Sequence, residues 1–484
     1  MEKNRVVKNY IYNLIYEAFL IIIPIAVTPY VARVLGENGS GQYSYAFSIN
    51  TYFTLFASFG FSYYAQRLIA SHQGDKEKQS VDFWEIILAR LIPSVISLIV
   101  YYVPIFFNVY GSSYNSLMII LSINVIATIF DIAFFFQGNE EFAIIVIRSI
   151  LIKIVSIACI FLFVKDKSDL LVYTFIQAIT VFLSNISLWL CLRKRIERVS
   201  IHELNPVKHI PATLTLFIPT ISTSVYTSLD KTLIGLITHL DSENGNYDYS
   251  EKLVKMAMTL LTSLGTVMTP RNSKKIVDGD IEGVKKNIYA SCNFVFFLGI
   301  PLVFGIIAVA DNFIPWYLGA GYDKAAMLMK ILSPIIVIIG LSNVFGRQYL
   351  IPSKRDKEFT TAVIAGATIN FVLNIILISK FYSYGAAIAT VIAELVVTLV
   401  MLSFIRKDIR FGTVIHKSWK EIISGFIMFV VCSFIGMSLK PSFINTGIII
   451  VVGIMVYCIS VILLRDSFAI QLINTFVKLR RKGE

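Results

Sequence analysis

The sequence predicts an all-α polytopic membrane protein with about fourteen transmembrane helices, arranged as two six-helix lobes with a parallel pseudo-two-fold repeat plus two extra C-terminal helices. The composition, the spacing of apolar runs and a short internal repeat support this prediction. Of the 484 residues, 56% are hydrophobic and 15% are charged, and the mean hydropathy is +0.72. Soluble domains contain about 25% charged residues, and a soluble chain of this length could not bury so much apolar surface. The composition therefore excludes a soluble enzyme and a disordered tail protein.

Long apolar runs divide the chain into the expected membrane spans. A helix needs about 20 mostly apolar residues to cross the hydrocarbon core of a bilayer. Such runs lie at roughly 10–32, 43–64, 84–107, 115–137, 142–164, 170–192, 211–238, 248–270, 288–310, 325–348, 359–380, 384–405, 420–438 and 444–464. Residues typical of turns separate several of them, so we expect loops at Gly36–Gly39, Gly138–Asn139, Asp241–Gly245 and Pro352–Lys354.

Basic residues set the orientation of these spans. With the N-terminus in the cytoplasm, most of the 43 Lys and Arg residues fall on the cytoplasmic face. The opposite face receives six of them, which are Arg33, Lys165, Lys167, Lys324, Lys380 and Lys440. Cytoplasmic loops of membrane proteins collect Lys and Arg, and an even number of spans returns the chain to its starting side. We therefore expect both termini in the cytoplasm.

Two short matches, each six spans apart, indicate an internal repeat. Gly41-Gln42-Tyr43-Ser44-Tyr45 opens the second span, and Gly245-Asn246-Tyr247-Asp248-Tyr249 opens the eighth. Glu141-Phe142 opens the fifth span, and Glu358-Phe359 opens the eleventh. Six spans return the chain to its starting side, so the two copies have the same orientation and enclose a cavity. The predicted parts are an N-terminal lobe at 1–205, a C-terminal lobe at 206–410, and accessory spans with a basic tail at 411–484.

Charge and cysteine spacing give no sign of nucleic acid, metal or cofactor. The net charge of +12 is the excess that cytoplasmic loops produce, so we expect no nucleic-acid partner. The five cysteines show no spacing typical of a zinc site or a disulfide framework. No segment outside the spans has room for a nucleotide-binding domain, and the sequence has no GxxxxGK(S/T) phosphate loop. We expect a protein that is not an enzyme and holds no cofactor, with an H⁺ or Na⁺ gradient as the candidate driving force.

Charged residues inside the expected spans mark the candidate site. A charge in hydrocarbon is costly, so such groups usually face a cavity or a partner. Lys231, Lys255 and Lys153 lie deep in their spans, on or near polar helix faces, which favours the cavity. Asp230 adjoins Lys231, and Glu251 lies four residues before Lys255, where the two can form an ion pair.

Two interpretations stay open for the other intramembrane charges. Four of them either extend along their apolar stems to the membrane surface or face the cavity, and these are Lys252, Lys330, Arg90 and Arg148. We keep Lys252 among the substrate-binding candidates. Glu17 and Glu394 are mid-membrane carboxylates that either carry a coupling ion or neutralise buried cations.

A set of short motifs follows in order along residues 8–405. They are Arg33-Val34-Leu35-Gly36 with Gly41-Gln42-Tyr43, Phe135-Phe136-Gln137-Gly138 with Glu141-Phe142, Leu229-Asp230-Lys231-Thr232-Leu233-Ile234-Gly235, Glu251-Lys252-Leu253-Val254-Lys255 with Thr269-Pro270-Arg271, and Tyr384-Gly385-Ala386-Ala387-Ile388-Ala389-Thr390. Together they resemble the polysaccharide repeat-unit (lipid-linked oligosaccharide) flippase family of the multidrug/oligosaccharidyl-lipid/polysaccharide exporter superfamily.

This resemblance implies a flippase that moves an undecaprenyl-diphosphate-linked oligosaccharide from the inner to the outer leaflet of the bacterial cytoplasmic membrane by alternating access. The glycan would serve capsule, O-antigen or teichoic-type synthesis. A diphosphate needs cations inside the membrane, which gives Lys231 and Lys255, supported by Arg33, the role of headgroup ligands. The apolar last two spans offer a groove for the polyprenyl tail. The implied partners are the lipid-linked glycan, membrane lipids, a glycan polymerase and glycosyltransferases.

Three alternatives compete with this interpretation. A lipid II flippase handles the same diphosphate chemistry and is the hardest to separate. A cation-coupled multidrug exporter of the same superfamily usually has twelve spans and an acidic pocket, which buried lysines argue against. A membrane glycan polymerase or ligase usually carries a large outer loop, and the expected spans leave no room for one.

Overall fold

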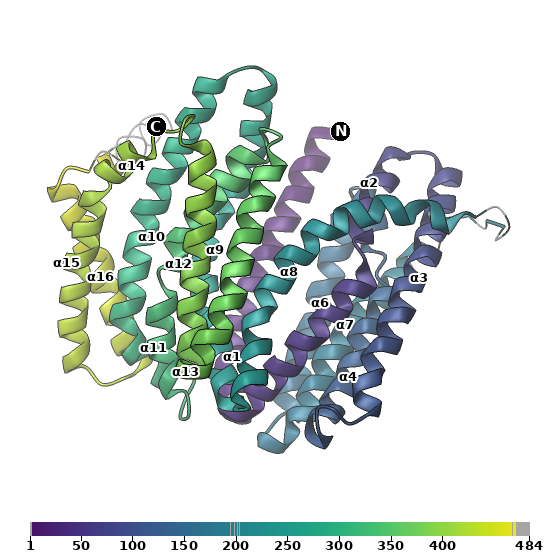
Figure 1. Cartoon of the computed structure of the whole chain (residues 1–484), viewed down its shortest axis with the longest axis horizontal. Coiled ribbons are helices and arrows are strands. Elements are labelled where there is room, and N and C mark those ends of the chain that lie inside the picture. The colour runs from purple at the N-terminus through teal and green to yellow at the C-terminus, as the bar shows by residue number, and fades with distance from the viewer. Residues whose placement is uncertain are drawn as a thin grey trace. The chain divides into compact units, whose positions relative to one another are not determined.

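The protein is built of helices. The computed structural model describes residues 2–193, 195–197, 199–200, 202, 204–466 and 468–470, without the side chains of 2–18, 20–22, 215–216, 218–227, 413 and 417. These residues form helices joined by turns and contain no strand, which confirms the all-α class (Figure 1). They pack as two units, Met1–Thr232 (unit 1) and Leu233–Glu484 (unit 2). The lobe boundaries at 205 and 410 stay predictions.

Unit 1 holds the helices of the first half of the chain. They are α1 (Glu2–Ser58), α2 (Phe61–Ser71), α3 (Lys76–Phe106), α4 (Ser112–Ile129), α5 (Ala133–Gly138), α6 (Phe142–Phe163), the 3-10 helix η1 (Lys167–Asp169), α7 (Leu170–Leu192), the 3-10 helix η3 (Pro206–His209) and most of α8 (Ile210–Thr238). Within unit 1, α4 packs against α1, α3 and α7. Its apolar core forms one cluster around Leu121 and a second, aromatic cluster around Phe83.

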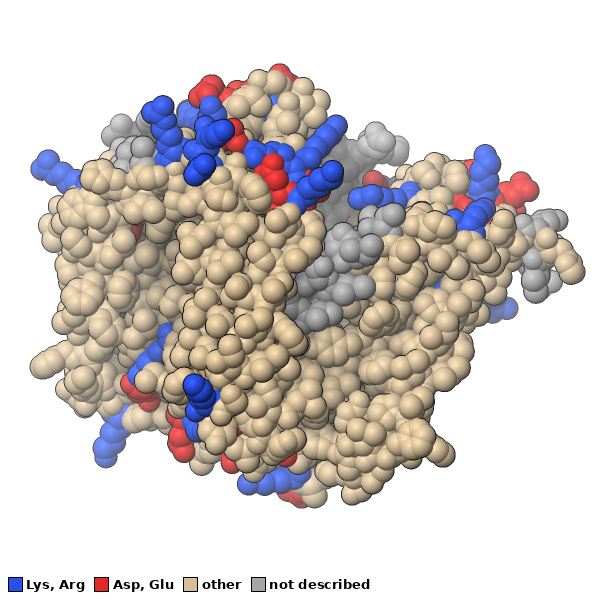
Figure 2. All heavy atoms as spheres, viewed as in Figure 1, with Lys and Arg blue, Asp and Glu red and all other residues tan. Residues whose placement is uncertain are grey.

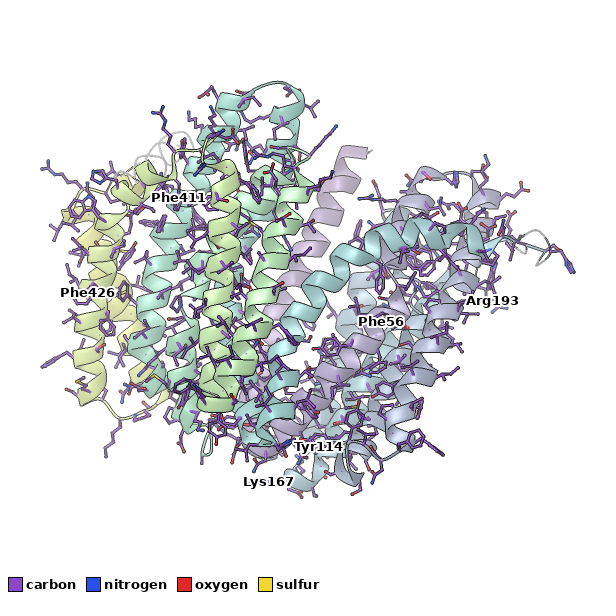
Figure 3. All side chains as sticks on the ribbon, in the orientation of Figure 1. Phe56, Tyr114, Lys167, Arg193, Phe411 and Phe426 are labelled. Atoms are coloured by element: carbon purple, nitrogen blue, oxygen red, sulfur yellow. The ribbon has the colours of Figure 1, made fainter. Side chains whose placement is uncertain are left out.

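Unit 2 holds the helices of the second half. They are α9 (Asp241–Val277), α10 (Ile281–Tyr317), α11 (Asp323–Leu332), α12 (Ile335–Phe345), the π-helix η4 (Gly346–Leu350), α13 (Asp356–Ile405), α14 (Phe411–Lys417), α15 (Trp419–Ser438) and α16 (Phe443–Leu463). Within unit 2, α15 and α16 pack on each other and on α10, and Figure 3 labels Phe426 on α15.

Two long helices are interrupted at a single residue. In α1 the break lies at Gly36, with φ 68° and ψ 179°, a backbone conformation that glycine adopts at little cost. In α13 the break lies at Tyr382, with φ 54° and ψ −135°. Each break separates two expected spans. The expected loop at Gly36–Gly39 is therefore a one-residue break followed by more helix.

The expected loop at Asp241–Gly245 is wrong. These residues form the first turns of α9, and Glu243, Asn244 and Gly245 are buried. Asn and Gly favour turns in isolation, but here tertiary contacts outweigh the weak local preference. Asn246, for example, donates from Nδ2 to the Gly321 carbonyl at 3.4 Å, 75 positions away.

Aspartates fix the start of two other helices. Asp75 precedes α3 and accepts a hydrogen bond from the Lys78 N–H at 3.1 Å, while Lys78 Nζ lies 2.9 Å away. Those Lys78 contacts, the side chain first, hold the pKa of Asp75 below its ordinary value. Asp280 precedes α10 and accepts from the Gly283 N–H at 2.8 Å. An N-cap carboxylate satisfies N–H groups that have no partner within the helix.

The helices suit a multi-pass membrane protein. Ten helical segments among the described residues are long and apolar enough to cross a membrane. Expected spans at 10–32, 43–64 and 211–238 lie in α1 and α8, which are not among the ten, and α13 contains two expected spans. In Figure 2, the face of unit 2 toward the viewer carries its charges at the two ends of its helices, with an uncharged band between them.

Matching aromatic contacts occur in the two copies of the expected repeat. In unit 1, the Tyr45 ring packs edge-on against Tyr114 at the start of α4, which Figure 3 labels, with centroids 5.2 Å apart. In unit 2, Tyr249 holds the same motif position and packs edge-on against Tyr322, just before α11, with centroids 5.4 Å apart. The helices α4 and α11 open the fourth and tenth expected spans, which are again six spans apart.

An ion pair joins the beginning of the fifth expected span to the end of the sixth, and another joins the beginning of the eleventh to the end of the twelfth. In unit 1, Glu141 before α6 pairs with Arg195 after α7 at 2.9 Å. In unit 2, Arg355 before α13 pairs with Asp408 after α13 at 2.7 Å. The signs are exchanged, but each pair ties the beginning of two spans to their end.

Candidate functional site

The charged residues of α8 lie beside a hydrogen-bonded contact with α1. Asp230 is buried and Lys231 is half-buried. The next residue, Thr232, has its Oγ1 2.8 Å from Ser48 Oγ and 3.0 Å from Tyr52 Oη. These bonds fix the end of α8 that belongs to unit 1 against the second half of α1. The structure therefore holds Asp230 and Lys231 at a polar helix junction.

The other candidate cations of unit 1 lie on α1 and α6. Arg33 is exposed on α1, three residues before the break at Gly36. Lys153 is half-buried on α6, and among the described residues no carboxylate forms an ion pair with it. The side chain of Glu17 lies outside the described residues.

The predicted ion pair of unit 2 is confirmed. Lys255 Nζ donates to Glu251 Oε1 at 2.6 Å, and Glu251 is 3% exposed. One turn earlier, Lys252 pairs with buried Asp248, and its Nζ lies 5.4 Å from the centroid of the Tyr249 ring. Both lysines thus have a carboxylate four residues before them, the spacing that joins side chains along one helix face.

The four remaining intramembrane charges have defined positions. Arg90 is 1% exposed, so it does not extend to the membrane surface. Arg148 donates to Ser187 Oγ at 2.6 Å. Lys330 pairs with exposed Asp311 at 2.6 Å, a partner that the sequence did not suggest. Glu394 is half-buried on α13, and its carbonyl accepts from Thr398 Oγ1 at 2.9 Å.

A buried carboxylate that sequence reasoning missed joins three helices of unit 2. Glu243 in α9 pairs with Lys324 in α11. It also accepts hydrogen bonds from Ser383 in α13, at 3.2 Å from the backbone N–H and 2.5 Å from Oγ. The Lys324 ammonium lies 5.6 Å from the Tyr382 ring centroid and 5.7 Å from that of Tyr384. This cluster stabilises the break at Tyr382. No sequence motif predicted the cluster.

An apolar groove lies in unit 2 where α15 and α16 meet α9 and α10. Its volume is about 580 Å³, and its walls are almost free of polar surface. Leu253 and Ala257 of α9 line it, as do Gly305 of α10 and Gly453 of α16. Because Leu253 and Ala257 are two residues from Lys255, the groove and the Glu251–Lys255 pair lie on opposite faces of α9.

Comparison with known proteins places this sequence in a family. The sequence pattern of the polysaccharide biosynthesis protein family matches residues 6–275. A protein assigned as an O-antigen transporter in Escherichia coli (strain K12) is 27% identical over 406 residues, which are 83% of this chain and 97% of that one.

Solved structures share the fold. The lipid II flippase MurJ in an inward closed conformation has a TM-score of 0.65 at 19% identity, over 92% of this chain and 99% of that one. An inward-facing multidrug resistance MATE family transporter has a TM-score of 0.62 at 12% identity, over 81% and 95% of the two chains. The sequence pattern of the polysaccharide biosynthesis protein family matches more than half of this chain, and the chain therefore belongs to that family.

Proposed function

We propose that this chain is a flippase for a lipid-linked glycan. Its substrate is an undecaprenyl-diphosphate-linked oligosaccharide repeat unit, which it moves from the inner to the outer leaflet of the bacterial cytoplasmic membrane by alternating access. The glycan serves capsule, O-antigen or teichoic-type synthesis. Glycosyltransferases supply the substrate and a glycan polymerase consumes it.

The observation that carries this proposal is similarity along almost the whole length of an O-antigen transporter. A chain that matches 97% of a transporter has room for the same transport cycle. The residues agree with the chemistry, because lysines within the spans suit a diphosphate and an apolar groove suits a polyprenyl tail.

The proposed architecture has fourteen spans in two six-helix lobes plus two accessory spans. The matched contacts Tyr45–Tyr114 and Tyr249–Tyr322 support the repeat. Both termini are cytoplasmic in this proposal, which a reporter fused after Glu484 tests. An outer location of that reporter would reverse the assignment of every loop.

The headgroup ligands proposed are cations on separate helices. Lys231 of α8 and Lys255 of α9 are each proposed to contact the diphosphate at some stage of transport, supported by Arg33. Lys153 and Lys252 are further candidate contacts to phosphate or sugar. Asp230 and Glu251 balance the charge of the neighbouring lysines when no substrate is bound, because a charge inside a membrane usually has an opposite charge beside it.

The polyprenyl tail is proposed to occupy the apolar groove, and filling the groove should slow transport. Gly305→Leu adds a side chain at a position that lines the groove, where an added Cβ comes no closer than 3.8 Å to Met428 Cε. We expect glycan flipping to fall at least about 10-fold, because a lost or displaced apolar contact of this size costs about 1.5–3 kcal/mol.

Gly447→Leu is the matched control for that substitution. Gly447 lies in the accessory helix α16, its added Cβ meets no atom within 4 Å, and it does not line the groove. If Gly305→Leu and the parent transport at the same rate, at equal amounts of folded protein, the polyprenyl tail does not occupy this groove.

Glu17 and Glu394 are the proposed ion-coupling residues. A carboxylate inside a membrane binds and releases protons or Na⁺ at a cost set by its surroundings. Glu17→Gln or Glu394→Gln should make flipping independent of an imposed pH or Na⁺ gradient, measured in proteoliposomes with a gradient of either sign. If both single variants respond to the gradient as the parent does, the two carboxylates are structural partners of buried cations.

The lipid II flippase is the second candidate, favoured by the MurJ-like fold. Purified protein in proteoliposomes, given a fluorescent undecaprenyl-diphosphate oligosaccharide or fluorescent lipid II, separates the two. We expect protein-dependent accessibility of the oligosaccharide lipid to a membrane-impermeant quencher, at a rate at least about 10-fold above that of lipid II, which corresponds to 1.4 kcal/mol. Flipping of lipid II alone would favour the second candidate.

A further inference from the structure

The segment that leads into α8 is fastened to α3 by one buried carboxylate. Glu85 Oε1 accepts a hydrogen bond from the Asn205 N–H at 2.8 Å. Its other oxygen, Oε2, lies 2.6 Å from Lys208 Nζ and 2.9 Å from His209 Nε2. Three contacts, from Asn205, Lys208 and His209, therefore hold the segment before α8 against one side chain of α3.

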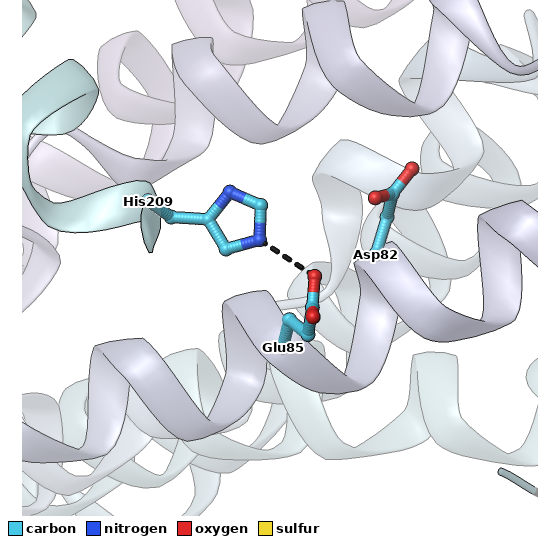
Figure 4. Close-up of side chains that lie close together, drawn as sticks. All are labelled: Asp82, Glu85 and His209. Carbon is cyan, nitrogen blue, oxygen red and sulfur yellow. Dashed lines mark hydrogen bonds and ion pairs between the residues drawn. The ribbon is translucent and has the colours of Figure 1, made fainter. Parts of the chain in front are cut away.

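Asp82 completes a set of three side chains with metal-ligating atoms. Asp82 and Glu85 are three residues apart on α3, so they leave the same helix face, and His209 reaches toward them from η3 (Figure 4). Their ligand atoms all lie within 4.8 Å of one another. The three residues are 6%, 1% and 1% exposed, so the set is enclosed by protein.

Neighbouring side chains orient this set from outside. The Tyr64 hydroxyl lies 2.7 Å from His209 Nδ1, and His72 Nδ1 lies 2.6 Å from Asp82 Oδ2. In metal sites, the ring nitrogen that faces away from the ion usually bonds a neighbour, which fixes the ring and its tautomer. Tyr64 has that position here. The Tyr64 hydroxyl can accept a hydrogen bond from Nδ1–H, and in that tautomer the lone pair of Nε2 is available to an ion.

We propose that Asp82, Glu85 and His209 form a binding site for a divalent transition metal ion, for which Zn²⁺ is the best fit. Zinc takes one imidazole and carboxylate oxygens at about 2.0–2.2 Å, with water in any remaining position. The ligand atoms of a bound zinc ion lie closer to one another than 4.8 Å, the limit within which the three ligand atoms lie here. Small rotations of the three side chains would therefore bring their ligand atoms to zinc-binding distance. Imidazole with carboxylates disfavours Ca²⁺ and Mg²⁺, which take oxygen ligands.

Lys208 would compete with the metal ion for a Glu85 oxygen. Its ammonium occupies the same Glu85 oxygen that the ion would bind, but its side chain is 48% exposed and can swing into solvent. The ion would replace this single positive charge by two, against the two carboxylates. Removing the lysine should therefore strengthen metal binding, whereas it would only weaken a plain ion-pair cluster.

The site would link η3, the entry to α8, to α3 within unit 1. It does not depend on the transport activity proposed above. Sequence spacing could not show it, because His209 and Glu85 are 124 positions apart.

The test uses the full chain, purified in detergent without a polyhistidine tag and stripped of metal with EDTA. Zinc content and affinity are measured by elemental analysis and by competition with a chromophoric chelator. We expect one Zn²⁺ per chain in the parent, none in His209→Asn, and tighter binding in Lys208→Met. Tyr64→Phe should weaken binding about 10-fold, the lower range for a residue that orients a metal-bound histidine.

His239→Asn is the matched control, since His239 is an exposed histidine of unit 2, and its zinc binding should equal that of the parent. Size-exclusion profiles identify variants that fail to fold, and Glu85→Gln, which can still accept the Asn205 hydrogen bond, gives a second ligand variant. Absence of Zn²⁺ from both the parent and Lys208→Met would overturn the proposal. Equal zinc affinity in the parent and His209→Asn would overturn it as well.

Discussion

Lys255→Ala is expected to abolish surface glycan in cells that depend on this chain for its export. The lysine lies 2.6 Å from the Glu251 carboxylate, which is 3% exposed, so its removal takes one ion-pair partner from a buried anion. In the proposed mechanism, the site then loses a cation that would attract the diphosphate and keeps an anion that would repel it. A charge-assisted hydrogen bond is roughly twice as strong as a neutral one, so the expected loss of glycan is near complete at parental expression. Surface glycan per folded protein is the measurement.

A paired substitution separates transport from folding. Glu251→Gln with Lys255→Gln removes both charges and keeps a hydrogen-bonding pair at the same spacing. We expect this double variant to fold like the parent and to export no glycan, because the cation is absent. If the double variant exports glycan at the parental rate, Lys255 acts only as the ion-pair partner of Glu251 and does not contact the diphosphate.

Lys231 and Lys330 extend the same comparison. Lys231→Ala should lose export as Lys255→Ala does, and Arg at either position should restore part of it, because the positive charge is retained. Lys330→Ala should export normally, since Lys330 pairs at 2.6 Å with Asp311, whose side chain is 68% exposed. Such an exposed pair is worth about 0–1 kcal/mol.

Local patterns in the sequence predicted local contacts correctly. The Glu251–Lys255 pair follows from a spacing of four residues on one helix, where geometry alone brings the side chains together. The helical class and the positions of the apolar segments follow from hydropathy in the same way. Matched motifs also pointed to Tyr45 and Tyr249, which make equivalent ring contacts.

Contacts between distant segments could not be predicted from one sequence. Glu243 lies in a stretch rich in turn residues, yet its partner Ser383 is 140 positions away, and that contact is part of what makes Asp241–Gly245 helical. The same holds for His209 and Glu85. For Arg90, hydropathy could show that a charge lies in an apolar run, but not that backbone carbonyls surround it.

Arg90→Met is expected to destabilise unit 1 strongly. Arg90 Nη1 donates to the Thr128 carbonyl at 3.3 Å and to the Asp131 carbonyl, which lie at the break between α4 and α5. The guanidinium also lies 5.9 Å and 5.4 Å from the ring centroids of Phe61 and Phe134. Methionine fills much of the volume but has no N–H to give the two carbonyls.

The size of the effect follows from those lost bonds. A hydrogen bond from a charged donor contributes about 1.5–3 kcal/mol, and a buried carbonyl left without a donor costs a further amount of similar size. We therefore expect Arg90→Met to lower the free energy of unfolding by about 3 kcal/mol or more, measured by denaturant titration of the purified chain in detergent. Arg90→Lys keeps one charged donor and should lose less.

Arg67→Met is the control, because Arg67 is exposed on α2 and a surface substitution usually changes stability by less than about 0.5 kcal/mol. Burying a charge is itself costly, and replacing a buried ion by an apolar side chain is sometimes neutral. A stability of Arg90→Met equal to that of the parent would therefore mean that the two carbonyls find other donors. The break between α4 and α5 would then be held by the aromatic packing around Phe134 instead of by the arginine.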